Sequence, residues 1–332
     1  MNCETFRALV VSKIDQKTFV REVKNCKLHD LPVGDVIVRV YYTSLNYKDG
    51  LSCIGARGIT NSYPHTPGID ASGVVVESMD SRFKPDDSVI VTGFDLGMNT
   101  SGGFGQYIRV PASWVVPLPD GLNLKESMIY GTAGFTAALS VYELQKYGLN
   151  PTKGEIVVSG STGGVGSVAV ALLNNLGYSV VASTGKTKVK HFLNSLGACE
   201  IIHRDELNND SKKALFKERW AGAIDTVGGT TLTSIIKSTK RGGAVAATGM
   251  VASPILSLTV FPFILRGVSL LGIDSSETLI SLRCKIWNLL ANEWKLKQLN
   301  QLKIDCVLDD LSSEIDKILE GKQQGRVVVD MQ

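Results

Sequence analysis

A glycine-rich segment between an apolar strand and an amphipathic helix most constrains what this chain can fold into. Residues 159–166 read Ser-Gly-Ser-Thr-Gly-Gly-Val-Gly. Gly160, Gly163 and Gly166 permit a tight turn and let the backbone approach a pyrophosphate, whose negative charge the N–H groups of the helix N-terminus favour. Strand, glycines and helix follow in the order that one βαβ unit requires. The segment therefore predicts a dinucleotide site rather than an ordinary turn.

The pattern around this segment indicates an α/β protein. From residue 155 to residue 273, strand-like and helical runs alternate, which is typical of a parallel sheet with helices on both faces. A helical run over residues 126–147 is interrupted by Gly131 and Gly134, so it reads as one helix or two. With 332 residues, two domains are expected. Short strands rich in Val, Ile and Tyr precede the alternation, and a closing strand ends it: Val36–Tyr42, Gly73–Glu77, Ser88–Thr92, Gln106–Val110 and Arg326–Asp330.

The end of the second strand of the alternation distinguishes NAD from NADP. An NAD site usually carries Asp or Glu there, but this chain has Thr184, Gly185 and Lys186. A hydroxyl and an ammonium group suit a 2′-phosphate, and Arg204 after the third strand could reach the same phosphate. The residues favour NADPH. The alternative is a solvated basic helix start, which also accounts for the lysines that follow.

Composition and charge exclude several classes of protein. A net charge of +3, with both signs interspersed, is too weak to indicate a nucleic-acid partner. Six cysteines without a Cys-x-x-Cys pair indicate reduced thiols in a cytoplasmic protein, not disulfides or structural zinc. The start lacks the pattern of a signal peptide. The apolar region 254–273 contains Pro262 and Arg266, which predicts two buried strand-like pieces rather than a membrane span.

Several segments together resemble the medium-chain dehydrogenase/reductases, and within them the zinc-independent acryloyl-CoA reductase branch, whose members are often labelled quinone oxidoreductases. The resemblance extends from about Arg7 to Arg326. Besides the glycine-rich segment, it is carried by residues 46–49 (Asn-Tyr-Lys-Asp), 67–70 (Pro-Gly-Ile-Asp), 131–137 (Gly-Thr-Ala-Gly-Phe-Thr-Ala), 220–228 (Trp-Ala-Gly-Ala-Ile-Asp-Thr-Val-Gly) and 262–266 (Pro-Phe-Ile-Leu-Arg).

The resemblance implies a fold and a set of cofactor contacts. It implies a GroES-like β-barrel catalytic domain from residues 1–125 and 267–332, and a doubly wound Rossmann domain from 126–266. Glu320 stands where the branch can have Asn, so its contact stays open. The implied NADPH-binding residues are Tyr47, Gly160, Thr162, Gly163, Gly164, Val165, Gly166, Thr184, Gly185, Lys186, Arg204, Met250, Ile264 and Ser275.

The resemblance also bears on metal and chemistry. The zinc alcohol dehydrogenases of this family have a Cys ligand where this chain has Asn46, and a His ligand where it has Ile69. Catalytic zinc needs three protein ligands, so no metal is expected. Without a Lewis acid, the favoured reaction is hydride addition to a double bond conjugated to a carbonyl, whose enolate needs hydrogen-bond donors.

Asn46, Tyr47 and Asp70 are the candidate catalytic residues. Asn46 could donate to the substrate carbonyl or fix the nicotinamide, Tyr47 could contact the cofactor ribose or pass a proton, and Asp70 could orient Asn46 or Lys48. Each also has a structural alternative: a satisfied turn, simple packing or a loop cap.

Acryloyl-CoA reduction to propanoyl-CoA with NADPH is the leading functional hypothesis. The alternatives are an NADPH-dependent quinone or enone oxidoreductase and, from another class, a non-catalytic NADPH-binding protein. Residues 268–273 read as the last Rossmann strand, and an apolar edge strand needs covering. Family members commonly pair this edge, so the resemblance predicts a homodimer.

Overall fold

The computed structural model describes residues 5–332, which form two compact units, each described here by itself; Cys3 lies outside the described residues. The first unit comprises residues 5–132, Ser276–Glu293 and Leu299–Gln332. The second comprises Ala133–Ser275 and Trp294–Gln298.

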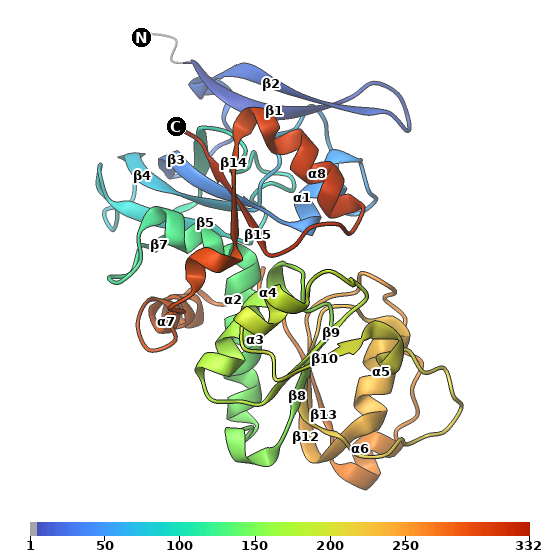
Figure 1. Cartoon of the computed structure of the whole chain (residues 1–332). Coiled ribbons are helices and arrows are strands. Elements are labelled where there is room, and N and C mark those ends of the chain that lie inside the picture. The colour runs from blue at the N-terminus through green and yellow to red at the C-terminus, as the bar shows by residue number, and fades with distance from the viewer. Residues whose placement is uncertain (1–4) are drawn as a thin grey trace. The chain divides into compact units, whose positions relative to one another are not determined.

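A six-stranded parallel sheet forms the centre of the second unit. Its order is β10-β9-β8-β11-β12-β13, which is the 3-2-1-4-5-6 order of a doubly wound sheet with its switch point between β8 and β11. Helix α3 lies on one side of the sheet and α5 on the other (Figure 1). The parallel sheet predicted from the alternating pattern is therefore confirmed. The strands are β8 (Ile156–Val158), β9 (Val180–Thr184), β10 (Glu200–His203), β11 (Trp220–Asp225), β12 (Thr239–Ala247) and β13 (Ser269–Gly272). The helices are α3 (Gly164–Asn175), α4 (Lys190–Ser195), α5 (Gly229–Ser238) and α6 (Phe261–Arg266).

A seven-stranded sheet and a separate hairpin form the first unit. The sheet order is β14-β15-β3-β4-β5-β7, with β6 also paired to β3. Strands β1 and β2 pair with each other. The strands are β1 (Thr5–Lys13), β2 (Phe19–Lys27), β3 (Val36–Leu45), β4 (Asp70–Ser78), β5 (Ser88–Thr92), β6 (Tyr107–Val110), β7 (Val115–Pro117), β14 (Lys303–Val307) and β15 (Arg326–Asp330). The helices are α1 (Tyr47–Cys53), α7 (Ile280–Ala291), α8 (Leu311–Leu319) and the start of α2 (Leu124–Lys146).

Each unit has its own apolar core. In the first unit, buried valines of β3, β4, β5 and β15 pack together with residues of α8. In the second, Val157, Val181 and Val245 from three strands of the sheet pack against Ile235 and Ile236 of α5. Burial of these side chains supplies the main favourable contribution to folding of each unit.

The apolar region 254–273 differs from its prediction. Its second half does contain the last strand of the sheet, β13, but its first half is a loop followed by helix α6. Pro262 stands at the start of that helix, where a missing N–H costs nothing, and Gly267 ends it in the left-handed conformation with φ 61°. Ile264 of α6 is 72% exposed, so this half is not buried.

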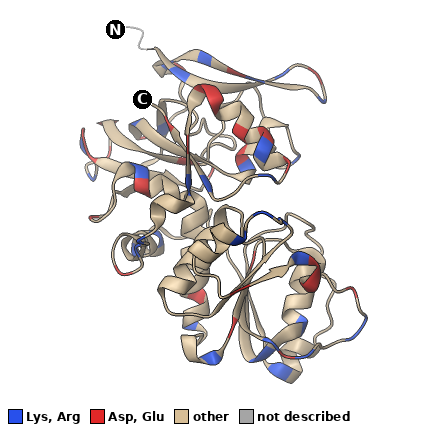
Figure 2. Ribbon diagram, in the orientation of Figure 1, with Lys and Arg blue, Asp and Glu red and all other residues tan. Residues whose placement is uncertain are grey.

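The surface carries charges of both signs. Figure 2 shows Lys and Arg interspersed with Asp and Glu along the ribbons of both units. Among residues 5–332, no helix has both the length and the apolar character needed to cross a membrane.

Candidate functional site: a glycine-rich loop and a buried polar network

The glycine-rich loop connects β8 to the N-terminus of α3. Gly160 has φ 58°, and a Cβ on it would lie 2.3 Å from Thr226 Oγ1. A Cβ on Gly166 would lie 2.4 Å from the carbonyl oxygen of Gly160. The fold itself therefore requires these two glycines. A Cβ on Gly163, in contrast, would come no closer than 3.4 Å to a protein atom. Gly163 leaves the loop backbone open on this side, as a bound pyrophosphate requires.

A buried carboxylate fixes the base of this loop. Asp225, the last residue of β11, accepts a hydrogen bond from Ser159 Oγ at 2.6 Å and from the backbone N–H of Gly228 at 2.8 Å. Ser159 Oγ in turn accepts from the backbone N–H of Thr226 at 2.9 Å. Burial raises the pKa of Asp225. These bonds join β8 to β11 at the switch point of the sheet.

The carboxyl ends of β9 and β10 bring together the residues expected at a 2′-phosphate. Thr184 pairs with His203 of β10, so Arg204 follows directly on the neighbouring strand. Thr184 Oγ1 accepts from the backbone N–H of Lys186 at 3.1 Å. The Arg204 side chain covers Gly185, since a Cβ there would lie 2.7 Å from Arg204 Cδ. Burial lowers the pKa of Lys186, so a bound anion would stabilise its charged form.

Of the other expected cofactor contacts, the structure brings some to the same edge of the sheet. Met250 follows the carboxyl end of β12, and Ser275 follows that of β13, where its Oγ accepts from Thr136 Oγ1 at 2.7 Å. Ile264 does not lie at this edge of the sheet. It lies in α6 beside Arg266, whose guanidinium donates to the carbonyl of Thr239, the first residue of β12.

Glu320, the contact that the sequence left open, belongs to the first unit. It follows the last residue of α8 and forms an exposed ion pair with Lys322 at 2.6 Å. The ion pair with Lys322 does not support a role of Glu320 in cofactor binding.

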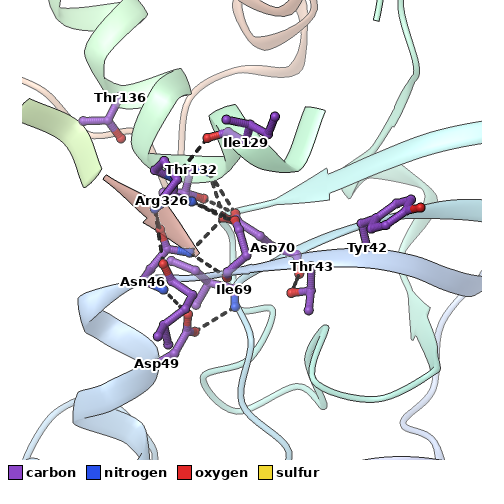
Figure 3. A network of polar contacts seen from close by, with 12 residues as sticks. Tyr42, Thr43, Asn46, Asp49, Ile69, Asp70, Ile129, Thr132, Thr136 and Arg326 are labelled. Carbon is purple, nitrogen blue, oxygen red and sulfur yellow. Dashed lines mark hydrogen bonds and ion pairs between the residues drawn. The ribbon is translucent and has the colours of Figure 1, made fainter. Parts of the chain in front are cut away.

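A buried polar network in the first unit is centred on Asp70 (Figure 3). Asp70 begins β4 and is fully buried. Its carboxylate accepts from Ser44 Oγ at 2.5 Å, from Asn46 Nδ2 at 2.8 Å, and from Thr132 Oγ1 at 2.6 Å. The backbone N–H of Thr132 also donates to it at 3.0 Å. These bonds hold the Asp70 side chain in one orientation.

Arg326, the first residue of β15, enters the same network. Strand β15 pairs with β3 so that Val327 lies opposite Leu45, which brings Arg326 beside Asn46. Its Nη1 donates to Asn46 Oδ1 at 3.2 Å, and its Nη2 lies 3.5 Å from Asp70 Oδ2. Sequence reasoning gave Arg326 no role. A single arginine directly before three valines in the closing strand was the available signal.

A second carboxylate, Asp49, lies on α1 and is also fully buried. Its Oδ2 accepts from the backbone N–H of Asn46 at 2.7 Å, and its Oδ1 from that of Ile69 at 2.9 Å. Burial, together with the negative charge of Asp70, raises the pKa of Asp49 to about 7. Sequence reasoning did not single out this residue.

A kink in α2 makes room for the network. Gly131 breaks the helical backbone with φ 51° and ψ −158°. A Cβ there would lie 2.3 Å from Asp70 Oδ2 and 2.7 Å from Arg326 Nη2. The helix expected over residues 126–147 is therefore interrupted at the first of its two glycines. Only glycine fits at this position, because any side chain would displace the buried charges.

The three candidate catalytic residues differ in exposure. Asn46 and Asp70 are buried, whereas Tyr47, the first residue of α1, is 38% exposed. Asn46 Nδ2 donates to Asp70 and to the carbonyl of Ser44 at 3.2 Å, so both of its amide hydrogens have acceptors within the protein. A substrate carbonyl would have to displace one of them. In residues 5–332, no three His, Cys, Asp or Glu side chains are grouped to hold a metal ion.

Two family models match this chain. Residues 32–120 match the family model described as alcohol dehydrogenase GroES-like domain, and residues 164–282 match the model described as zinc-binding dehydrogenase. The chain is 46% identical to acrylyl-CoA reductase AcuI from Ruegeria pomeroyi, covering 98% of this chain and 99% of that protein. It is 45% identical to quinone oxidoreductase YhfP from Bacillus subtilis, covering 98% of each.

Solved structures superpose closely on this fold. The yhdH oxidoreductase from Salmonella enterica, in complex with NADP, has a TM-score of 0.95 and 42% identity over 98% of this chain and 100% of that chain. The Bacillus subtilis protein yhfP with NAD bound also has a TM-score of 0.95, with 44% identity over 98% of this chain and 99% of that chain.

Proposed function

The chain belongs to the medium-chain dehydrogenase/reductase superfamily, and we propose that it uses NADPH to reduce the activated carbon–carbon double bond of acryloyl-CoA to propanoyl-CoA. The observation that carries the proposal is the 46% identity to acrylyl-CoA reductase AcuI over almost the whole of both chains. The space beside the backbone of Gly163 and the cationic end of β9 fit a phosphorylated dinucleotide.

NADPH, when bound, supplies the hydride for the β-carbon of the substrate. The proposed binding residues are the loop N–H groups of residues 162–166 for the pyrophosphate, and Thr184, Lys186 and Arg204 for the 2′-phosphate. This phosphate would replace the water lost by the partly buried ammonium of Lys186. The relative with NAD bound makes cofactor preference a point for direct measurement.

Tyr47 is the proposed catalytic residue of the first unit, because its side chain is exposed at the start of α1. As negative charge develops on the carbonyl oxygen of the substrate, the Tyr47 hydroxyl donates a hydrogen bond or passes a proton. Asn46 and Asp70 are proposed to position it. This refines the expectation that Asn46 itself donates to the substrate, since both of its amide hydrogens are used within the protein.

The second candidate function is reduction of quinones or other enones, which the name of the relative YhfP supports. NADPH oxidation should be measured with acryloyl-CoA, crotonyl-CoA and small quinones as acceptors. Acryloyl-CoA should give the highest kcat/KM. Faster turnover of quinones than of both thioesters would replace the first candidate by the second. Binding of NADPH without oxidation in the presence of any acceptor would indicate a non-catalytic binding protein.

The proposed assembly is a homodimer in which the β13 edges of two chains pair. Strand β13 ends the order of its sheet, and Phe261, Ile264 and Leu265 of α6 nearby in sequence are exposed apolar side chains. A second copy would cover both features. The proposed compartment is the cytoplasm, in keeping with free thiols at the five described cysteines.

A further inference from the structure

The guanidinium of Arg326 joins separate parts of the buried network (Figure 3). The residue is only 2% exposed. Its Nη2 donates to Ser44 Oγ at 2.7 Å and lies 3.5 Å from Asp70 Oδ2, while its Nη1 donates to Asn46 Oδ1 at 3.2 Å. Because the guanidinium is planar and its donors diverge at fixed angles, these contacts set the orientation of the Asn46 amide relative to Asp70.

The orientation of this amide is transmitted to the start of α1. With Oδ1 directed at Arg326, Nδ2 is left to donate to Asp70 at 2.8 Å. The backbone N–H of the same asparagine donates to Asp49 at 2.7 Å. Tyr47 is the next residue and the first of α1. Arg326 is therefore linked to the backbone that carries the exposed tyrosine, both through the Asn46 side chain and through its own Nη1, which donates to the carbonyl of Leu45 at 3.2 Å.

Arg326 also supplies the positive charge opposite two buried carboxylates. Asp49 and Asp70 are both fully buried, and the buried thiol of Cys53 on α1 faces Asp49 as well. Two ionised carboxylates against one guanidinium leave a net negative charge in the interior, which is unfavourable. Loss of the guanidinium would raise the pKa of Asp49 further, because the positive charge of Arg326 interacts favourably with the ionised carboxylate.

We propose that Arg326 is a positioning residue for the reduction: it holds the Asn46 amide and offsets the buried carboxylates, which keeps Tyr47 in place at the start of α1. The proposal rests on the proposed function. Arg326 is buried and need not touch substrate. Both oxygens of Asp49 accept N–H bonds, and a carboxylate accepts more strongly when ionised, so activity should require the ionised form of Asp49.

The test compares Arg326→Met with Arg283→Met. Arg283 is an equally buried arginine of the same unit, whose Nη1 donates to the carbonyl of Thr92 and whose Nη2 donates to that of Ser276, each at 2.9 Å. Both variants lose a buried guanidinium and its carbonyl contacts. Arg283 is outside the Asp70 network, so it controls for a general loss of stability.

For Arg326→Met, kcat should fall about a hundredfold, the size of effect that a small misplacement near the reaction can cause, while the NADPH Kd stays within about twofold. The acidic limb of the kcat–pH profile should move to higher pH. For Arg283→Met, the acidic limb should stay where it is in the wild type. Arg326→Lys keeps the positive charge but loses the planar set of N–H donors, so it should lower kcat without moving the acidic limb of the profile.

A measurement without substrate tests the charge role separately. The pKa of Asp49 is raised from 3.8 to about 7 in the folded state, so the free energy of unfolding should fall as pH rises through this interval. In Arg326→Met, the fall should continue to higher pH. In Asp49→Asn, this contribution should be absent.

The proposal is overturned if Arg326→Met lowers kcat no more than Arg283→Met, or leaves the acidic limb unmoved. If Arg326→Met does not fold, Arg326→Lys decides: a kcat within about twofold of the wild type contradicts the positioning role. If the wild type oxidises NADPH with none of the acceptors, the proposed function fails, whereas an unaltered pH dependence of unfolding in the variants would overturn the charge role alone.

Discussion

At the scale of single residues, the first unit depends on a backbone position where no side chain fits. The kink at Gly131 leaves the space in which the carboxylate of Asp70 meets the guanidinium of Arg326. A buried ion pair is stable only if its remaining polar atoms are also bonded. Here Ser44 and Thr132 provide those bonds. The arrangement of the buried charges therefore depends on the absence of a Cβ at Gly131.

Gly131→Ala should therefore destabilise the protein more than an ordinary glycine replacement. Gly58 in the same unit also has a positive φ, 83°, but a Cβ there would meet nothing within 4 Å. Gly58→Ala should cost only the backbone strain of about 1–3 kcal/mol. Gly131→Ala should lose more free energy of unfolding in urea, because its Cβ also displaces Asp70. Equal losses for the two variants would show that the network tolerates the added atom.

At the scale of elements, the sequence predicts those strands and helices whose pattern is set by residues adjacent in the chain. Strands Ser88–Thr92 and Arg326–Asp330 have the bounds expected from their β-branched residues and flanking turns. The β1–β2 hairpin was missed because β2 mixes charged with apolar residues and is largely exposed. Helix α1 was missed because seven residues are too few for a helical period to show.

The candidate site also has a part that local sequence patterns predict and a part that they do not. The glycine-rich loop and the end of β9 are local features, and the sequence located both. The Asp70 network joins residues from β3, β4, α2 and β15, far apart in the chain. Only the sheet register brings Arg326 to Asn46, so no local pattern could predict their contact.

The carboxyl end of β9 gives the prediction on cofactor preference. Lys186 is partly buried beside Thr184, whereas Lys188 two residues on is exposed. Lys186→Ala should weaken NADPH binding by about tenfold or more and leave NADH binding nearly unchanged, because it removes a charge-assisted contact to the 2′-phosphate alone. Lys188→Ala should change neither Kd by more than about twofold. Equal wild-type affinity for both cofactors, measured by fluorescence titration, would contradict the assignment.

At the scale of the whole molecule, the edge strand and the exposed side chains of α6 lead to the proposed dimer. Ile264→Glu would place a charge on the surface that a second copy is proposed to cover. The wild type should have twice the mass of one chain at micromolar concentration in analytical ultracentrifugation, and Ile264→Glu should shift the mass toward that of one chain. A wild-type mass of 35.8 kDa would contradict the dimer.

The central claim, that the chain transfers a hydride from NADPH to the double bond of acryloyl-CoA, can be tested on the product itself. NADPH carrying deuterium on the transferred position of the nicotinamide should be incubated with the protein and acryloyl-CoA, and the acyl product analysed by mass spectrometry and NMR. The account predicts propanoyl-CoA with one deuterium at the β-carbon, formed in a one-to-one ratio with NADP⁺. Oxidation of NADPH without propanoyl-CoA, or propanoyl-CoA without deuterium at that carbon, would contradict it.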